Sequence, residues 1–458
     1  MSVAIGDING DGRRDLVVPT TEGLPTKRVS VLVNTPRLCN VQDVSGMTQA
    51  AARRTLAGAG CKVGRPRQVR STGVERGRVL SQKPGFGALP HDRTVHLVVS
   101  AGPGPPRTLA PPSFAPPVSY PVAHGGQAIA IADLDGDGSQ DVVTANCGRT
   151  ASVLVNRGDG TFRPRRDYHT DACPEAMAVG DVSGDRRPDI VTSNEETISV
   201  LLNRGDGTFE ARHDYSAPGE QAYGENYVAL GDLDGDGKPE VVVANALEDA
   251  NSGLWVFFNK GDGTFEPKHH RRLGGDLPSA VAIGDLNGDG KPDLATENGW
   301  QADVILNRGS GKLQQAKRTY RAGGDGSDVF LGDLNDDRRA DMVVTYPDGN
   351  AVQVFLNNGD GSFRPYVDYR AGGLPSWVAI GDLNGDGTPD MTAANSSAHS
   401  VSVMLNRGDG TFKAKLDYAV GRRSPAAVAA GDLNGDGRAD LVTVNGNDVS
   451  ALINTPGR

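Results

Sequence analysis

The sequence predicts a mainly all-β protein, in which a seven-bladed β-propeller is accompanied by one small α+β module. An acidic motif, D-x-[DNS]-x-D-x-x-x-[DE], begins eight times along the 458 residues. Its last seven copies follow one another at intervals of 48 to 53 residues, which is the period of a repeated multi-stranded unit. The 61 Gly and 28 Pro indicate many tight turns instead of long helices.

Each repeat unit contains the pattern of four short strands. Runs such as residues 198–203 and 401–406 are apolar, rich in β-branched side chains and bounded by Asn and Gly. An Asp-Gly pair, as at Asp206 and Gly207, then permits the positive φ of a tight hairpin leading to the next phenylalanine. Four antiparallel strands in about fifty residues are typical of a propeller blade. The seven complete units begin at Phe114, Phe162, Phe209, Phe265, Leu313, Phe363 and Phe412.

The V-A-x-G-D-L-N-G-D-G and G-D-G-T-F signatures resemble the FG-GAP/VCBS repeat, the blade of integrin α-subunit propellers and of many secreted bacterial proteins. The resemblance implies one propeller over residues 113–458. Residues 1–36 hold a further partial repeat, and VSVLVNTPR there matches VSALINTPGR at the end of the chain. We therefore expect residues 1–36 to be the end of a truncated upstream propeller, whose missing start would carry a signal peptide. The alternative is an eight-bladed ring that includes residues 1–36.

Residues 38–104 interrupt the repeats. Thr48 can cap a helix through Ala57, with Met47, Ala51 and Leu56 as its buried face, and strands follow the helix. V-x-D-V-x-G-M-T and the later V-x-L-x-V-S resemble a PASTA domain, which in bacterial cell-wall kinases is associated with peptidoglycan. Residues 40–104 carry ten Lys or Arg against three acids, and this +7 charge would suit an anionic wall polymer. Residues 105–112 are expected to form a Pro-rich linker.

The acidic loops are the candidate cation sites. Calcium binds six to eight hard oxygens, and because no His joins the acids, a structural role is predicted instead of a catalytic one. The predicted ligands are positions one, three, five and nine of the eight copies: Asp7, Asn9, Asp11, Asp15; Asp133, Asp135, Asp137, Asp141; Asp181, Ser183, Asp185, Asp189; Asp232, Asp234, Asp236, Glu240; Asp285, Asn287, Asp289, Asp293; Asp333, Asn335, Asp337, Asp341; Asp382, Asn384, Asp386, Asp390; and Asp432, Asn434, Asp436, Asp440.

Two copies depart from this pattern. Ser183 and Arg186 change the third copy, while Asp336 and Arg338 change the sixth, so we expect these to be the weakest sites. An arginine side chain in place of the ion is one alternative there. The other is that the carboxylates only cap hairpins, as Asx turns do.

The four cysteines form two local groups, Cys39 with Cys61 and Cys147 with Cys173. An even count with this spacing predicts disulfides in an oxidising compartment, without settling the pairing. Together with the repeats, the cysteines predict a secreted or cell-surface protein. No segment has the length and hydrophobicity of a membrane span.

The leading functional hypothesis is a calcium-stabilised extracellular bacterial binding or adhesion protein without catalytic residues. Its propeller face would bind a protein or glycan, and its PASTA module would contact the cell wall. The alternatives are a propeller-scaffold enzyme acting on polysaccharide and a purely structural wall spacer. No G-x-S-x-G, H-E-x-x-H or Cys/His pair is present, and the acidic repeats argue against nucleic acid. Candidate ligand-face residues are Asn146, Glu195, Tyr223, Tyr227, Glu248, Asp249, Trp300, Tyr346, Trp377 and His399.

Overall fold

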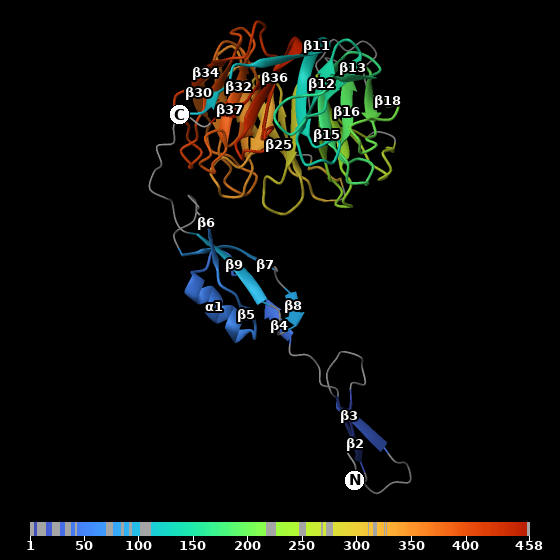
Figure 1. Ribbon diagram of the computed structural model, residues 1–458, viewed down its shortest axis with the longest axis vertical. Coiled ribbons are helices and arrows are strands. Elements are labelled where there is room, and N and C mark those ends of the chain that lie inside the picture. The colour runs from blue at the N-terminus through green and yellow to red at the C-terminus, as the bar shows by residue number, and fades with distance from the viewer. Residues whose placement is uncertain are drawn as a thin grey trace. The chain divides into compact units, whose positions relative to one another are not determined.

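The computed structural model divides the chain into two compact units, Met1–Pro106 and Arg107–Arg458 (Figure 1). The structure describes residues 4–6, 15–20, 28–32, 38–41, 44–69, 77–83, 87–90, 94–100, 111–216, 226–246, 253–266, 269–271, 278–309, 311–314, 318–324, 326 and 328–455.

In the first unit, three strands pair only with one another. They form an antiparallel sheet in the order β1 (Ala4–Gly6), β2 (Asp15–Thr20) and β3 (Arg28–Leu32). The ring in the second unit closes without them, so the eight-bladed alternative is wrong. The expectation that residues 1–36 end an upstream propeller stays a prediction.

The segment predicted as an α+β module contains one helix, α1 (Gln49–Gly58), beside short strands. Thr48 is its N-cap, as predicted, and accepts a hydrogen bond from the backbone N–H of Ala51 at 3.3 Å. The helix buries Leu56 as predicted, but with Ala52 instead of Met47 and Ala51. The strands are β4 (Leu38–Val41), β5 (Lys62–Val63), β6 (Arg67–Val69), β7 (Val79–Lys83), β8 (Gly87–Pro90) and β9 (Thr94–Ser100).

The second unit is an all-β propeller. Five of its sheets have four antiparallel strands in sequence order. Their bounds are β15 (Pro174–Gly180), β16 (Asp189–Asn194), β17 (Thr197–Leu201), β18 (His213–Ser216); β19 (Asn226–Gly231), β20 (Glu240–Asn245), β21 (Gly253–Phe257), β22 (His269–Arg271); β23 (Ala280–Gly284), β24 (Asp293–Glu297), β25 (Gln301–Ile305), β26 (Arg318–Arg321); β27 (Val329–Gly332), β28 (Asp341–Tyr346), β29 (Ala351–Phe355), β30 (Val367–Arg370); and β31 (Pro375–Gly381), β32 (Asp390–Asn395), β33 (Ser400–Met404), β34 (Leu416–Ala419).

The sixth sheet corrects the predicted blade number. Its strands run in the order β14-β13-β12-β11-β36-β35, so the first and last repeats share one six-stranded sheet and the described ring has six blades, not seven. The cause is β11, a single strand whose start pairs with β36 and whose end pairs with β12. The bounds are β11 (Val118–Ala132), β12 (Asp141–Asn146), β13 (Thr150–Leu154), β14 (Arg166–His169), β35 (Ala427–Gly431) and β36 (Asp440–Leu452).

The two ends of the ring-forming segment also meet directly. Strand β10 (Ser113–Phe114) pairs with β37 (Asn454–Thr455), so the first phenylalanine completes the hairpin of the last repeat. The prediction that Phe114 begins a separate blade is therefore wrong. In the closed ring, β10 belongs to the last repeat. Its pairing with β37 removes sheet edges that would otherwise be unpaired.

Neighbouring sheets pack through strands that are buried on both faces, such as β12, β16 and β32. The repeated tyrosine and phenylalanine join one repeat to the next. Tyr168 of β14 lies edge-on to Phe209 in the following hairpin, with ring centroids 5.3 Å apart. The same pairing recurs at Tyr120 and Phe162, Tyr215 and Phe265, Tyr320 and Phe363, Tyr369 and Phe412, and Tyr418 and Phe114.

A repeated asparagine also connects neighbouring repeats. The Asn203 side-chain amide donates to the carbonyl oxygen of Leu134 in the preceding acidic loop at 3.0 Å and to that of Pro188 at 2.9 Å. Its Oδ1 accepts from the N–H of Gly205 at 2.7 Å. We call these residues the inter-repeat asparagines: Asn156, Asn203, Asn259, Asn307, Asn357, Asn406 and Asn454, whose amides reach the preceding loop at 2.5 to 3.0 Å.

Candidate cation loops and ligand face

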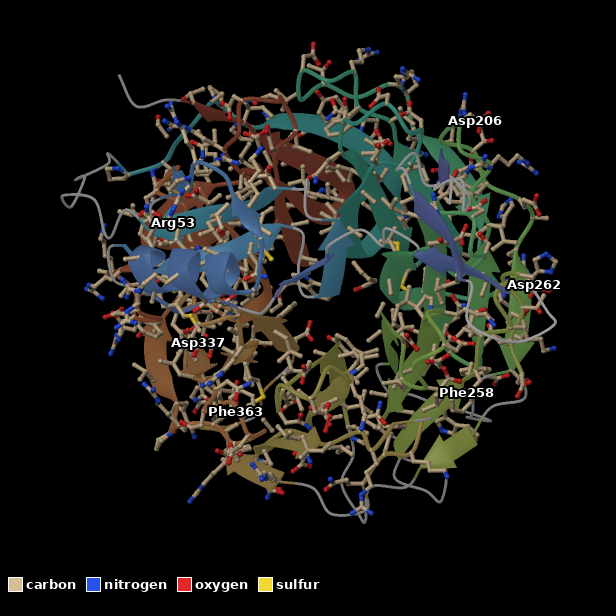
Figure 2. The ribbon with its side chains drawn as sticks, turned by 90° about the horizontal axis from the view of Figure 1, so that it is seen from below. Arg53, Asp206, Phe258, Asp262, Asp337 and Phe363 are labelled. Carbon is tan, nitrogen blue, oxygen red and sulfur yellow. A yellow bond between two sulfur atoms is a disulfide. The ribbon has the colours of Figure 1, made fainter. Side chains whose placement is uncertain are left out.

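The acidic loops all lie at one end of the ring. Each joins the first and second strands of its repeat, and antiparallel pairing places the Asp-Gly hairpins after the third strands at the same end. The connections between second and third strands lie at the other end. We call these the acidic end and the opposite end. In Figure 2, Asp206 and Asp262 of the Asp-Gly hairpins lie at the periphery of the ring.

Within each loop, the carboxylates hold the backbone. In the loop beginning at Asp133, the N–H groups of Gly136 and Gly138 donate to the two oxygens of Asp133 at 2.8 and 3.0 Å. The ninth residue, Asp141, is buried and accepts from the N–H groups of Leu134 at 2.9 Å and Asn156 at 2.7 Å. These bonds satisfy backbone donors that a tight turn would otherwise leave without partners.

Two loops bring three carboxylates together. Oxygens of Asp133, Asp135 and Asp141 lie within 4.8 Å of one another, and the same holds for those of Asp232, Asp234 and Glu240. These are the two loops with an acid at position three, and among the described residues no other group of three metal-ligating acids, histidines or cysteines is this close. Asp137 and Asp236 do not belong to these groups, and Asp236 instead pairs with Lys238 at 3.0 Å. Hard carboxylate oxygens in this arrangement fit calcium.

The ninth-position acids have perturbed protonation equilibria. Burial raises the pKa of Asp141 to about 6 and that of Glu240 to about 7, more than their hydrogen bonds from the backbone lower it. Nearby carboxylates, including Asp135 and Asp234, add to the rise. A bound cation would oppose both effects because it favours the ionised form. Burial likewise raises the pKa of Asp293, Asp341 and Asp440 to about 6, that of Asp390 to about 7, and that of Asp189.

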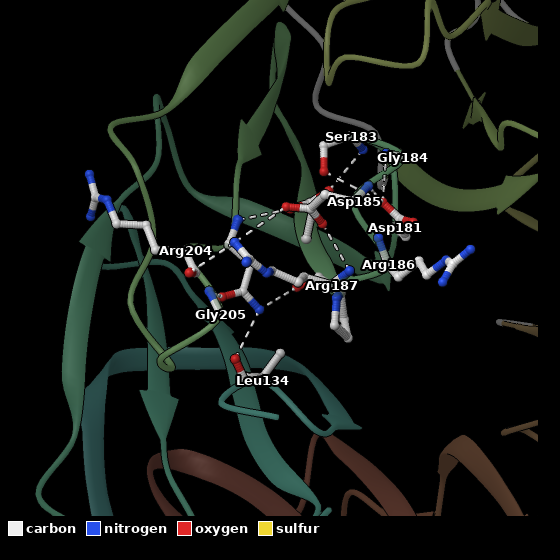
Figure 3. A network of polar contacts seen from close by, with 12 residues as sticks. Leu134, Asp181, Ser183, Gly184, Asp185, Arg186, Arg187, Arg204 and Gly205 are labelled. Atoms are coloured by element: carbon white, nitrogen blue, oxygen red, sulfur yellow. Dashed lines mark hydrogen bonds and ion pairs between the residues drawn. The ribbon is translucent and has the colours of Figure 1, made fainter. Parts of the chain in front are cut away.

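The two irregular loops keep the same backbone bonds. Asp181 accepts from the N–H groups of Gly184 and Arg186, each at 2.7 Å, although Arg186 stands where other loops have glycine. Arg186 has φ 67°, a conformation that disfavours side chains with a Cβ. Its side chain extends away from the carboxylates, while that of Arg187 lies 3.6 Å from Asp185 (Figure 3). An Arg186 side chain in place of the ion is therefore wrong for this loop.

The sixth copy, the other irregular loop, also places arginine at a positive φ and keeps the backbone bond to its first aspartate. Asp336 and Arg338 have φ values of 59° and 68°, and the N–H of Arg338 donates to Asp333 at 2.7 Å. The remaining predicted ligands, in the loops beginning at Asp285, Asp382 and Asp432, lie in the same turn geometry. In the first copy, Asp7, Asn9, Asp11 and the side chain of Asp15 lie outside the described residues. The predicted ion occupancy of all eight loops stays a prediction.

A disulfide joins Cys147 to Cys173 at the opposite end, linking a loop of the six-stranded sheet to the segment that enters β15. Cys61 is also disulfide-bonded. The side chain of Cys39 lies outside the described residues, so its predicted pairing with Cys61 stays a prediction.

The predicted ligand-face residues do not form one exposed surface. Asn146 is buried and donates to Ser152 at 3.0 Å, which makes it part of the sheet interior. Glu195, His399 and Trp300 are exposed at the opposite end, and Trp300 is 57% exposed. Tyr346 is partly buried. Tyr223, Glu248 and Asp249 lie outside the described residues.

Tyr227 and Trp377 instead line a cavity of about 380 Å³ bounded by inner strands of five sheets. The Trp377 ring is stacked on Tyr227 with centroids 6.5 Å apart and contacts Phe330 edge-on at 5.5 Å. Apart from Asp328, the lining residues that the structure describes are apolar or aromatic. We interpret this cavity as part of the ring's aromatic packing.

Sequence reasoning missed the inter-repeat asparagines. Their signal was present in every V-S-V-L-L-N-R-G-D-G stretch, where Asn ends the third strand. In the sequence this Asn marks only the boundary of a strand, because a single sequence does not reveal that its amide reaches the preceding repeat. Among the described residues, no helix is both long and apolar enough to cross a membrane.

Comparison with known families and structures agrees with this architecture. FG-GAP-like repeats match residues 133–192, 181–243, 232–296, 333–393 and 382–443, together more than half of the chain, and a PASTA domain matches residues 40–101. An Agrocybe aegerita lectin that recognises non-reducing terminal N-acetylglucosamine is 22% identical, covering 74% of this chain and 97% of its own, with a TM-score of 0.52.

Two further structures are similar. BBS1N, solved in complex with ARL6DN, is 15% identical and covers 76% of this chain and 97% of its own, with a TM-score of 0.52. Chaetomium thermophilum Raptor is 13% identical and covers 76% of this chain and 29% of its own, with a TM-score of 0.51. At these identities the similarity shows the fold alone.

Proposed function

The chain belongs to the FG-GAP-like repeat family, and from this we propose that it is a non-catalytic binding or adhesion protein whose opposite end engages a protein or glycan ligand. The contrast between the two ends of the ring carries this proposal. At the acidic end, the same carboxylates bond the same backbone groups in repeat after repeat. Because these carboxylates already accept hydrogen bonds from their own loops, few of them are free to bind a partner.

The opposite end differs from repeat to repeat. Its described loops present a disulfide at Cys147, two glutamates at Glu195 and Glu196, an exposed indole at Trp300 and an imidazole at His399. Loops held by a rigid sheet scaffold are where binding residues concentrate, because they can vary without disturbing the core. The lectin and the ARL6DN-bound structure show that propellers of this type can serve as binding scaffolds.

We assign calcium a structural role at the acidic end, with the loops of Asp133 and Asp232 as the strongest sites. Three clustered carboxylates and a ninth acid whose pKa is raised support this assignment. Calcium would neutralise their mutual repulsion and stiffen the connection between first and second strands.

The PASTA domain supplies a second surface, which we assign to an anionic cell-wall polymer such as peptidoglycan. Arg53 and Arg78 donate to the backbone carbonyls of Gly64 and Gly46, each at 3.0 Å, so part of their role is structural. The side chains of Arg54, Lys62, Arg65 and Arg67 are exposed. Together with the FG-GAP-like repeats of the ring, this favours an extracellular, wall-associated protein.

The test is a binding screen with the full chain against a glycan array and a purified cell-wall fraction in calcium. Alanine variants of Trp300 and His399 at the opposite end are compared with Lys238→Ala and Lys291→Ala, controls at the acidic end whose side chains are 39% and 45% exposed. We expect ring-dependent binding to fall only with the first pair. Retention of no ligand would favour the structural spacer, and product release from a polysaccharide would favour the enzyme.

A further inference from the structure

One hollow at the opposite end has the chemistry of a specific ligand subsite. Its volume is about 470 Å³, and it is lined by Trp300, Gln301, Thr319 and Arg321. All four residues belong to β25, β26 or the loop entering β25. Gln301 lies directly opposite Arg321 in the register of the two strands, and Asp303 lies opposite Thr319. Because side chains two residues apart share a face of a strand, these four register positions face the same side.

Trp300 is held in place by its backbone. Its N–H donates to the carbonyl of Asn298 at 3.2 Å, and its own carbonyl accepts from the N–H of Ala322 at 2.9 Å. The indole is nevertheless 57% exposed, and it is the one aromatic side chain among the large exposed hydrophobic residues that the structure describes. A fixed backbone carrying an uncovered ring is a preorganised stacking surface, so little ordering entropy is lost when a ligand binds.

In the Trp300 sheet, an exchange of residues leaves the outer strand β26 without the aspartate that outer strands such as β14 and β18 carry. In other sheets a serine on the third strand donates to an aspartate on the outer strand, as from Ser152 to Asp167 at 2.6 Å and from Ser199 to Asp214 at 2.7 Å. Those outer aspartates pair with Arg165 and Arg212. In the Trp300 sheet the order is reversed, because Thr319 on the outer strand donates to Asp303 on the third strand at 2.6 Å.

The exchange moves the carboxylate inward. Asp303 is fully buried and also accepts from the side-chain amide of Asn298 at 2.8 Å. The outer strand β26 therefore carries no acid, and Arg321 is exposed without an ion-pair partner among the described residues. In a chain with a formal net charge of −10, an exposed arginine beside an exposed indole attracts an anionic group.

We propose that this hollow binds a carboxylate-bearing sugar, with the pyranose stacked on Trp300 and its carboxylate paired with Arg321. The apolar face of a sugar ring suits an indole, and a guanidinium matches a carboxylate with two parallel hydrogen bonds. The amide of Gln301 supplies a donor and an acceptor for sugar hydroxyls. The volume falls within the range of about 300 to 1,000 Å³ for small-ligand sites. The inference rests on the proposed function and names its ligand class.

The test compares two sugars that differ in charge, methyl β-D-glucuronide and methyl β-D-glucoside, titrated into the full chain in calcium. Saturation-transfer NMR reports binding. Tryptophan fluorescence reports the environment of Trp300, since the chain has only three tryptophans. We expect the glucuronide to bind at least about tenfold more tightly than the glucoside. Trp300→Ala should weaken both sugars by about tenfold, while Arg321→Gln should abolish the preference for the charged sugar.

Arg370→Gln is the matched control, because Arg370 occupies the equivalent register position of the next sheet, where Asp368 is present on the same strand. This variant should keep the preference. Binding of neither sugar, equal binding of both, or a preference that survives Arg321→Gln would overturn the proposal. Inorganic phosphate competing as well as the glucuronide would also overturn it, by indicating an anion site without sugar recognition. If the wild-type chain binds an array or wall ligand but does not bind the glucuronide, the inference fails and the proposed function stands.

Discussion

Replacing the inter-repeat asparagine Asn357 by alanine should destabilise the ring by about 3 kcal/mol. The Asn357 side chain is buried and donates to the carbonyls of Leu286 at 3.0 Å and Ala340 at 2.9 Å, and it accepts from the N–H of Gly359 at 2.7 Å. Each hydrogen bond contributes about 0.5–1.5 kcal/mol net. The carbonyl of Leu286 keeps a second donor, the N–H of Gly361 at 3.0 Å, so the loss stays near the middle of the summed range.

Calorimetry in a fixed calcium concentration measures this effect. For a ring of this size, about 3 kcal/mol corresponds to a melting temperature lower by roughly 3–6 °C. The adjacent Asn358 is the matched control, because among the described residues its exposed amide donates to Ser362 Oγ alone, at 3.0 Å. Asn358→Ala should change stability by less than about 0.5 kcal/mol. Equal melting temperatures for the two variants would refute the conclusion that these amides hold neighbouring repeats together.

Four further predictions concern the acidic end and the disulfide. Excess EDTA should lower the melting temperature by many degrees, and an unchanged melt would exclude structural calcium. Without calcium, stability should fall as pH rises from about 5 to 7, because the buried ninth-position acids have pKa values of about 6 to 7 and bind more protons folded than unfolded; a rising or flat thermal melt contradicts this. Arg186→Gly should stabilise the protein by about 1 kcal/mol in urea unfolding, because glycine tolerates positive φ, and a loss would show that the side chain contributes. Joint replacement of Cys147 and Cys173 by serine should cost about 3 to 4 kcal/mol for a separation of 26 residues and make the melting of the ring insensitive to reductant, while the disulfide of Cys61 remains in the first unit.

Several features could be predicted from the sequence because they are local. The motif spacing predicted the repeated antiparallel strands, and the Asp-Gly pairs predicted the hairpins at Gly160, Gly207 and Gly263, all of which have positive φ. The cap at Thr48 and the disulfide between Cys147 and Cys173 were also predicted correctly, the latter as an open pairing. Loops with an acid at position three gave the two carboxylate clusters. Each of these depends on a few adjacent residues or on a fixed period.

The ligand-face predictions were less successful, because whether a side chain is exposed depends on how neighbouring strands and repeats pack against it. Asn146, Tyr227 and Trp377 follow the same sequence signals as surface residues, yet the first is buried in its sheet and the other two pack along the inner strands. The Trp300 hollow depends on Arg321, twenty-one positions later, and on the exchange between Asp303 and Thr319. That exchange can be recognised only when the register of β25 and β26 is known, because it places Asp303 opposite Thr319.

The sequence by itself determined the repeat, the identity of its strands and the positions of the acidic loops, because hydrophobic period and turn residues act over short distances. The tertiary structure decided how the ring closes. Six sheets form instead of seven because β11 is one continuous strand shared by the first and last repeats. It also decided which polar groups meet across repeats, from the amide of Asn156 on the carbonyl of Leu433 to the exposed pair of Trp300 and Arg321. Such contacts depend on the closed ring, which no local pattern encodes.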